Sequence, residues 1–418
     1  MTASSRETAL QVIEDCLRIS RCTEDEHVLT RTFLSPPMVE VHAILRASME
    51  RAGMEVRIDA MGNLRGLDRG SGAVGDGARR RLLIGSHIDT VPNAGAFDGV
   101  LGVALAVALV RGLAVRRREF DIEVVAFSEE EGVRFSVPFL GSRALIGDVD
   151  SGLMKSRDVA GVSVEEAIRN FGLEPLAMAD AVVSPDAFGY VEFHIEQGPV
   201  LDLMVKEAGK PILGIVEEIV GQTRMVLTFT GESNHAGTTP MKLRRDALAG
   251  AAEWMLAVET LANDRQGIVA TVGEAVVRPG AANVVPGEVR VSLDLRHAED
   301  SVREKAVRDL ISSAEGTAAR RGLRVESRIQ SEQRAVKMDA ALTGRLEAAV
   351  TASGAVPHRM VSGAGHDAMM MARRVPSAML FVRSPGGVSH HPDETVMVED
   401  VQAALDAGLY FLDALQRA

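Results

Sequence analysis

The sequence predicts an α/β protein in which a smaller two-layer domain is inserted into a larger one. Near the start of the chain, apolar strand-like runs alternate with helical patterns, which is typical of a sheet covered by helices. In a middle segment the order changes to strand, helix, strand, strand, helix, strand. The length of 418 residues also exceeds one ordinary core. We therefore expect one domain from residues 1–216 and 334–418, and an inserted domain from residues 217–333.

The larger domain is expected to contain a strand, a helix and a second strand in its first half, and to end with a helix, a strand and a helix. The predicted elements are residues 82–85, 99–113, 122–127, 340–352, 377–382 and 398–415. Residues 68–80 are polar and rich in glycine, which indicates an exposed loop.

The inserted domain is expected to contain four strands and two helices. The strands are 224–230, 268–274, 288–295 and 324–329, and the helices are 243–261 and 302–321. A β-α-β-β-α-β unit of this kind forms a two-layer, ferredoxin-like arrangement.

Charge and cysteine usage restrict the partners and the compartment. The net charge of -12 argues against a nucleic acid or an anionic membrane as partner, and the basic runs 79–81 and 116–118 are expected at solvated loop ends. Cys16 and Cys22, both in a predicted N-terminal helix, offer no disulfide framework and no cysteine zinc site. The N-terminus has no secretory pattern, and the apolar stretch 99–110 is too short to span a bilayer. We expect a cytoplasmic protein.

A histidine and an aspartate stand at the end of an apolar strand. Residues 84–91 read I-G-S-H-I-D-T-V, so His87 and Asp89 are two residues apart and share a face if the strand continues. This suits an imidazole that binds a metal while its other nitrogen donates to a carboxylate. A plain hydrogen-bonded pair is the commoner explanation, so this motif alone does not decide.

Acidic residues follow two further apolar segments. Asp98 lies in G-A-F-D-G-V-L-G, where it is either a helix N-cap or a carboxylate able to bridge two cations. Three acids stand in F-S-E-E-E-G-V-R-F, residues 127–135. They are either a solvated loop or the pair that a hydrolytic metal site needs, in which one acid binds the cation and its neighbour accepts a proton from water.

Two more histidines complete a set of five segments with metal-type ligands. His194 lies in F-H-I-E-Q-G-P and His390 in G-G-V-S-H-H-P-D-E. A single histidine is most often structural, but five such segments, most of them near strand ends, favour a site at the carboxyl edge of an α/β sheet. The donors are nitrogen and oxygen, which suits zinc, manganese, cobalt or nickel better than magnesium alone.

Several long motifs are together highly specific. They are SHIDTVPNAGAFDGVLG, EEGVRF, FHIEQGPVL, NHAGTTPM, the stretch 283–296, SGAGHDA and SHHPDE. On these motifs, from about residue 5 to residue 415, the chain resembles the carbamoylase branch of the dinuclear metallopeptidase-like amidases. That branch includes N-carbamoyl-L-amino-acid hydrolases, β-ureidopropionases and allantoate amidohydrolases. The resemblance implies a mixed-sheet catalytic domain and an inserted domain that dimerises and closes over the site, so we expect a homodimer.

The resemblance also implies roles for residues of the larger domain. Two divalent ions would be bound by His87, Asp98, Glu131, His194 and His390, with Asp98 bridging them. Glu130 would be the general base and Asp89 the carboxylate that orients His87. The family has Glu-Glu-Gly, so Glu129 is the extra acid, and the family ligand directly after Ser matches His390 rather than His391.

Substrate contacts are implied in both domains. In the inserted domain the matching residues are His235, which would donate to an oxyanion, Asn283, and Arg296. Arg296 alternates with inward apolar residues and is either an ordinary exposed strand arginine or a bidentate ligand of a substrate carboxylate. In the larger domain, Gln197 would hold the ureido end, and His366 would line the site.

One position departs from the family. Arg383 stands where relatives commonly carry a small or apolar residue or proline. It is either an additional anion contact that alters substrate preference or a surface residue.

The main functional hypothesis is hydrolysis of the carbamoyl C–N bond of an N-carbamoyl-L-amino acid, which releases ammonia, carbon dioxide and the amino acid. The alternative substrate is allantoate. A dinuclear aminopeptidase or deacylase would share the metal ligands. A non-catalytic binding protein would usually have lost a ligand or the base, and none of the matched positions is missing.

Overall fold

The computed structural model of the chain describes residues 4–71, 79–113 and 118–416. It divides into two compact units, which we call unit 1 (Met1–Glu217 with Lys337–Ala418) and unit 2 (Glu218–Val336). Part of the loop predicted over 68–80 lies outside the described residues, as does most of the run 116–118.

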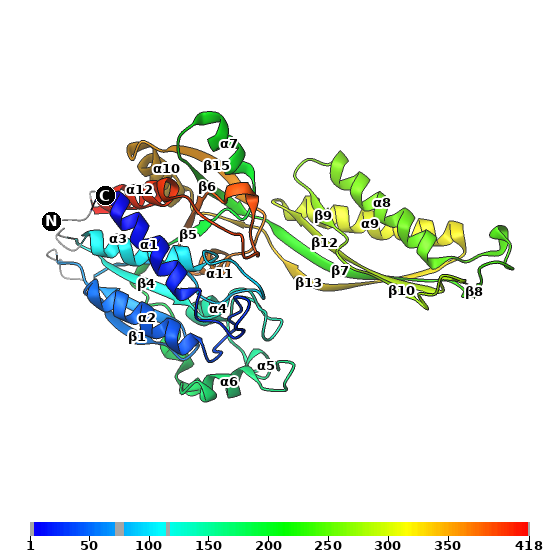
Figure 1. The fold of residues 1–418 in the computed structure, drawn as a ribbon, viewed down its shortest axis with the longest axis horizontal. Helices are drawn as coiled ribbons and strands as arrows, with labels where there is room; N and C mark the ends of the chain where they lie inside the picture. Colours follow the sequence, from blue (N-terminus) through cyan, green and yellow to red (C-terminus); the bar gives the residue numbers. More distant parts are fainter. Residues whose placement is uncertain (1–3, 72–78, 114–117, 417–418) are drawn as a thin grey trace. The chain divides into compact units, whose positions relative to one another are not determined.

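Unit 1 is built on a nine-stranded mixed sheet (Figure 1). The spatial order is β1 (Glu55–Ile58), β2 (Leu64–Asp68), β4 (Asp121–Phe127), β3 (Arg81–His87), β5 (Ala187–Ile195), β16 (Ser377–Val382), β6 (Ile212–Ile219) and β14 (Val336–Lys337), with β15 (Val356–Ser362) paired to β6. The four central strands β4, β3, β5 and β16 are parallel, and the flanking pairs β1–β2, β2–β4 and β16–β6 are antiparallel. The predicted α/β fold with a mixed sheet is confirmed.

The helices of unit 1 cover this sheet. The longer ones, which share its main apolar core, are α1 (Ser5–Ile19), α2 (Met38–Arg51), α3 (Val100–Leu113), α10 (Ala340–Ala352) and α12 (Val398–Gln416). The shorter ones are α4 (Leu140–Ile146), α5 (Ser151–Met154), α6 (Val164–Asn170), α7 (Val200–Ala208) and α11 (Asp367–Met371), with 3-10 turns at Pro175–Ala181 and Pro385–Gly387.

Helix α3 is the central core helix, because every residue from Val100 to Val110 is buried. A side chain at Gly102 would place its Cβ 2.0 Å from the Phe193 carbonyl oxygen, so a glycine is required where α3 crosses β5. The apolar stretch of the sequence is therefore an internal helix, and no described helix is long and apolar enough to cross a membrane.

Two expectations about unit 1 were wrong. Helix α1 ends at Ile19, so Cys22 lies beyond the helix in which it was expected. Both cysteines are buried and have free thiols. The basic residues of the two runs are not all solvated, because Arg81 pairs with Glu123 (2.7 Å) and Arg118, which is buried, pairs with Asp68. Acidic residues on β2 and β4 draw these guanidinium groups inward.

Unit 2 has the predicted ferredoxin-like arrangement. Its antiparallel sheet has the order β10 (Ala275–Arg278), β12 (Glu288–His297), β7 (Gly221–Thr230), β13 (Arg324–Gln333), with β9 (Val269–Thr271) also paired to β12. Helices α8 (Ala247–Asp264) and α9 (Asp300–Arg321) share a separate core with the inward residues of these strands, and Trp254 is fully buried in it. Alternate residues of β12 are buried, as its sequence pattern predicts.

Of the strand predicted over 268–274, only the part Val269–Thr271 is formed, as β9, and β10 follows beyond the predicted bounds. A small two-stranded sheet, β8 (Asn234–His235) with β11 (Val284–Val285), was not predicted, and a 3-10 turn at Met241–Leu243 precedes α8. Pairs of only two residues are too short to show an alternating pattern.

Candidate metal centre

The site lies where four neighbouring parallel strands end. His87 is the last residue of β3, residues 128–131 directly follow β4, His194 is the second-last residue of β5, and the segment with His390 follows β16. Because parallel strands point the same way, their carboxyl ends meet at one edge of the sheet, which is where α/β proteins form binding crevices.

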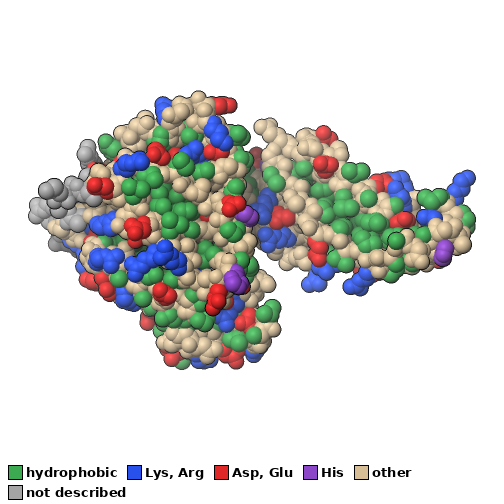
Figure 2. Space-filling model, in the orientation of Figure 1, with side chains coloured by type: hydrophobic (Ala, Val, Ile, Leu, Met, Phe, Trp, Pro, Cys, Tyr) green, Lys and Arg blue, Asp and Glu red, His purple; other side chains and the backbone are tan. Residues whose placement is uncertain are grey.

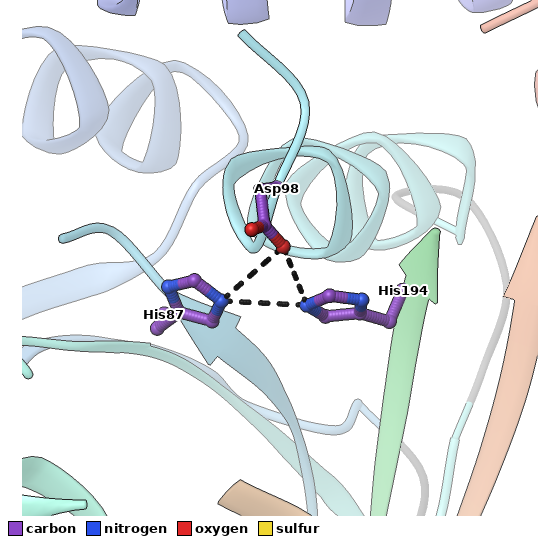
Figure 3. A group of neighbouring side chains, drawn as sticks. All are labelled: His87, Asp98 and His194. Atoms are coloured by element: carbon purple, nitrogen blue, oxygen red, sulfur yellow. Dashed lines mark hydrogen bonds and ion pairs between the residues drawn. The ribbon is translucent and has the colours of Figure 1, made fainter. Parts of the chain in front are cut away.

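Asp98 lies just before α3, and its carboxylate faces the rings of His87 and His194 (Figure 3). Its Oδ1 is 3.8 Å from His87 Nε2 and 3.3 Å from His194 Nε2, and the two Nε2 atoms are 3.3 Å apart. All three residues are buried. Of the two alternatives for Asp98, this placement favours the carboxylate shared by ligands over a plain helix cap.

The hydrogen bonds of the two rings fix which nitrogens can accept a cation. The Nδ1 of His87 lies 3.1 Å from the Asp89 carbonyl oxygen, and the Nδ1 of His194 lies 2.9 Å from that of Ile195. A carbonyl only accepts, so both Nδ1 atoms carry hydrogen and a neutral ring turns its Nε2 lone pair toward the other. Two facing acceptors require positive charge between them, so the arrangement fits a cation.

Electrostatics support the same conclusion. Burial would lower the pKa of His87, but the carboxylates of Asp89, Glu130 and Asp98 raise it well above its usual value. Burial lowers the pKa of His194 to about 4, which keeps this ring neutral as a metal ligand must be. The carboxylates around the two rings therefore favour a positive charge at this place, either on the His87 ring or on a cation bound between the rings.

A second group shares Asp98. His390 Nε2 is 3.2 Å from Asp98 Oδ2 and 3.6 Å from Glu131 Oε1, and the side-chain amide nitrogen of Gln197 donates to both Asp98 oxygens (3.1 and 3.2 Å). Potential ligand atoms of Asp98, Glu131 and His390 lie within 4.8 Å of one another, as do those of His87, Asp98 and His194. Two groups of three with one common carboxylate are the arrangement that a pair of ions needs.

The Asp89 carboxylate contacts both His87 and the backbone of the acidic residues that follow β4. Its Oδ1 accepts the backbone N–H of Glu130 (2.9 Å) and lies 3.3 Å from His87 Nδ1, and its Oδ2 accepts the N–H of Glu131 (3.1 Å). Burial and the charge of Glu131 raise the pKa of Glu130 well above its usual value. Burial and the charge of Asp98 raise the pKa of Glu131 to about 8. A bound divalent cation would reduce the electrostatic repulsion between carboxylates that lie this close together.

The neighbours of the predicted ligands are placed apart from the cluster. Glu129 Oε2 accepts the backbone N–H of Phe33 (3.0 Å), and His391 Nδ1 accepts that of Asp393 (3.2 Å). His366 is buried behind His194, with ring centroids 4.4 Å apart, and its Nε2 lies 3.1 Å from Ser362 Oγ. His366 therefore packs against the predicted ligand His194.

Arg383 takes neither of the roles considered for it from sequence. Its Nε donates to Asp400 (2.7 Å) and its Nη1 to Asp202 (3.3 Å), so it joins α12 and α7 beneath the turn after β16. The adjacent Ser384 Oγ accepts the backbone N–H of Gln197 (3.0 Å). The ion pairs of Arg383 therefore help to hold the segment that contacts Gln197 in place.

Sequence reasoning missed two buried acids. Glu192 accepts from Ser86 Oγ (3.1 Å) and from the Ala368 N–H (2.8 Å), which joins β3, β5 and α11 under the site. Glu394 accepts from the segments of both Asp98 and His390. Glu394 belongs to the SHHPDE motif and was available as a candidate, whereas Glu192 stands in an ordinary strand pattern.

The predicted residues of unit 2 lie at two places. His235 and Asn283 are together, because β8 pairs with β11 and the Ala236 N–H donates to the Asn283 carbonyl (2.9 Å). Arg296 lies near the other end of β12, paired across the sheet with Gln222, and its Nε and Nη2 donate to both oxygens of Asp294 (2.9 and 3.0 Å). As predicted, Arg296 is on the face of β12 opposite the buried residues.

Comparison with known proteins now decides the family. The model of peptidase family M20/M25/M40 matches residues 83–414, a range that holds every proposed metal ligand. The chain belongs to this family. This M20 chain is 39% identical over 443 residues to a protein named probable allantoate deiminase from Oryza sativa subsp. japonica, covering 97% of this chain and 88% of that one. It is also 39% identical over 360 residues to the N-carbamoyl-L-amino acid amidohydrolase of Geobacillus stearothermophilus, covering 85% and 86%.

A solved structure extends the similarity. A hydantoinase/carbamoylase family amidase from Burkholderia multivorans matches this M20 chain with a TM-score of 0.88 at 29% identity, over 98% of each chain. The chain is a hydrolase of linear amides in a metal-dependent family, and its clusters of possible ligands agree with that.

Acidic and basic side chains are interspersed on the face of the molecule drawn in Figure 2.

Proposed function

We propose that this M20 chain is a metal-dependent amidohydrolase that cleaves the carbamoyl C–N bond of an N-carbamoyl-L-amino acid. The products are ammonia, carbon dioxide and the free amino acid. The observation that carries the proposal is the pair of ligand groups that share Asp98, with Glu130 beside them. The relatives named for such substrates support it. The two free thiols support a reducing compartment, and we propose the cytoplasm.

The metal proposal is two divalent ions, of zinc, manganese, cobalt or nickel. His87, Asp98 and His194 would hold one, and Asp98, Glu131 and His390 the other. When bound, such ions supply Lewis-acid activation of a carbonyl group and of a water molecule. The donor set of imidazoles and carboxylates suits these metals.

Glu130 is proposed as the residue that moves the proton. It accepts a proton from the attacking water and delivers it to the departing ammonia, and the carbamate that remains loses carbon dioxide. Asp89 fixes the backbone of Glu130 by accepting its N–H (2.9 Å).

His235 is proposed as a donor to the oxyanion that forms during attack on the carbonyl. Its Nδ1 accepts the backbone N–H groups of Gly237 (3.1 Å) and Thr238 (3.2 Å). A neutral ring with an accepting Nδ1 carries its hydrogen on Nε2, so His235 presents an N–H at its exposed tip. Arg296 is proposed to bind the substrate carboxylate, and Asn283 and Gln197 to contact the rest of the substrate.

The spacing within unit 2 supports a homodimer. The turn with His235 meets the start of β12, where the Gly231 N–H donates to the Gly287 carbonyl (2.7 Å). Arg296 is eight residues further along that strand than Glu288, a separation of roughly 26 Å at the rise of an extended chain. One small substrate cannot touch both ends, so we propose that a second copy of the chain supplies His235 and Asn283 to a site that uses Arg296.

Allantoate is the second candidate substrate, because relatives named for it are as similar to this chain as those named for carbamoyl amino acids. The test is ammonia release from N-carbamoyl-L-amino acids, N-carbamoyl-β-alanine and allantoate after reconstitution with each of the four metals. Dipeptides and N-acyl amino acids are assayed beside them. Preference for an N-carbamoyl-L-amino acid supports the proposal, and preference for allantoate selects the alternative. Cleavage of only dipeptides or N-acyl amino acids, or of nothing in the panel, contradicts both.

A further inference from the structure

Glu394 is a buried carboxylate whose hydrogen bonds all go to the segments that carry proposed ligands. Its Oε1 accepts the backbone N–H groups of Phe97 and Asp98, both at 3.0 Å. Its Oε2 accepts the hydroxyl of Ser389 at 3.1 Å. One side chain thus connects the loop before α3 with the loop after β16, although the two are nearly 300 residues apart in sequence.

The loop before α3 is shaped to receive this carboxylate. A Cβ at Gly95 would lie 2.3 Å from Glu394 Cβ and 2.5 Å from its Oε1, so any larger residue there would push Glu394 away. Ser389 directly precedes His390, whose left-handed φ of 53° is unusual for a residue other than glycine. Each residue that donates to Glu394 is therefore either a proposed ligand or the residue directly before one.

A carboxylate at this position is not explained by fold stability alone. It is buried close to Asp98, and a second acid beside a buried acid is unfavourable unless its hydrogen bonds are needed. Acceptors for two neighbouring N–H groups and a hydroxyl provide such a need. The hydrogen bonds fix the backbone on both sides of the ligand pair Asp98 and His390.

We propose that Glu394 is a positioning residue that holds Asp98 and His390 at the spacing required to bind a divalent ion together. The inference rests on the proposed metal function and adds a residue to it. Glu394 acts through its hydrogen bonds, and its charge is secondary. Groups that orient metal ligands in this way typically change metal affinity or activity about 10- to 100-fold when they are removed.

Three variants separate this role from a general structural one. Glu394→Ala removes the bridge. Glu394→Gln preserves it, because the amide oxygen can accept both N–H groups while the amide nitrogen donates to Ser389. Ser389→Ala removes only the link to His390 and is small enough to fold if Glu394→Ala does not. The matched control is Asp121→Ala, since Asp121 is a buried carboxylate at the opposite end of β4 that accepts the Gly70 N–H (2.9 Å).

Metal affinity is measured by competition with a chromophoric chelator, and kcat and KM are measured on the metal-loaded protein. We expect Glu394→Ala to bind one of the two ions about 10- to 100-fold more weakly, with a lower kcat and an unchanged KM. Ser389→Ala should show a smaller loss in the same ion, and Glu394→Gln should be close to wild type. Asp121→Ala should keep both affinities.

Wild-type affinity for both ions in Glu394→Ala, or in Ser389→Ala if the first variant does not fold, overturns the inference while leaving the metal centre intact. A Glu394→Gln variant as impaired as Glu394→Ala also overturns it, because charge would then matter rather than hydrogen bonds. A wild-type protein that binds no divalent ion overturns the proposed metal centre and this inference with it.

Discussion

Units 1 and 2 hold their predicted site residues in different ways. In unit 1, His87, Asp98 and His194 are at most 2% exposed, and a second polar group fixes each of the two rings. In unit 2, His235 is exposed on the short strand β8, Asn283 is exposed directly before β11, and Arg296 is partly exposed. Buried, fixed groups suit chemistry that needs a preset geometry, whereas exposed groups suit recognition of a molecule that arrives from solvent.

His390 is the exception in unit 1, because its side chain is 47% exposed. It lies on the loop that Glu394 and Ser389 hold in place. An exposed ligand needs support from its own loop, which is why the bridge of Glu394 is expected on this side of the centre and not beside His194.

The largest effect is expected from Glu130→Gln in unit 1. The variant keeps the size and backbone contacts of the proposed base but cannot accept a proton, so kcat should fall by about 10²- to 10⁴-fold while both ions stay bound. Stopped ammonia assays and metal analysis of the same samples measure this. Glu129→Gln is the control, since Glu129 bonds to the Phe33 N–H and should lose little activity. Normal turnover in Glu130→Gln would refute the assigned role.

An intermediate effect is expected from Arg296→Met in unit 2. Losing charge-assisted hydrogen bonds to a substrate carboxylate should raise KM roughly 10- to 100-fold and leave metal affinity unchanged. Arg224→Met is a matched control, because Arg224 also donates to Asp294 (3.1 Å) but has no predicted substrate role. Weaker metal binding in Arg296→Met would contradict the assignment of metal binding to unit 1 and substrate recognition to unit 2. Equal KM values in the two variants would contradict the proposal that Arg296 binds the substrate carboxylate.

The same division explains what could be predicted from sequence. The core of parallel strands was predictable because apolar strands that end in polar residues recur at β3, β4 and β5. The predicted metal ligands are among these polar residues at the strand ends. Glu394 could not be assigned a role, since its partners Phe97 and Asp98 are set by tertiary packing alone. In unit 2 the burial alternation of β12 was predictable, but the pair β8 and β11 was not, because its two residues per strand carry no period.

The ion pair between Arg296 and Asp294 gives the smallest expected effect and a pH dependence. Burial would raise the pKa of Asp294, but the hydrogen bonds from Arg296 and Arg224 outweigh burial and hold it below its usual value. A lowered folded pKa stabilises the folded state above the unfolded value of about 3.9, and this stabilisation is lost as the pH falls toward the folded value. Asp294→Asn should therefore lower the free energy of unfolding at pH 7 by up to about 1 kcal/mol, since solvent screens a pair this exposed.

Unfolding of unit 2 can be followed alone, because Trp254 is the single tryptophan of the chain and is buried in the core of that unit. In denaturant titrations read by Trp254 fluorescence, the difference between wild type and Asp294→Asn should shrink as the pH is lowered from 7 to 3. Glu326→Gln removes a carboxylate with a 63% exposed side chain on β13, which β7 separates from β12, and should show no measurable difference. A difference for Asp294→Asn that is constant with pH would mean that the charge of Asp294 does not hold Arg296.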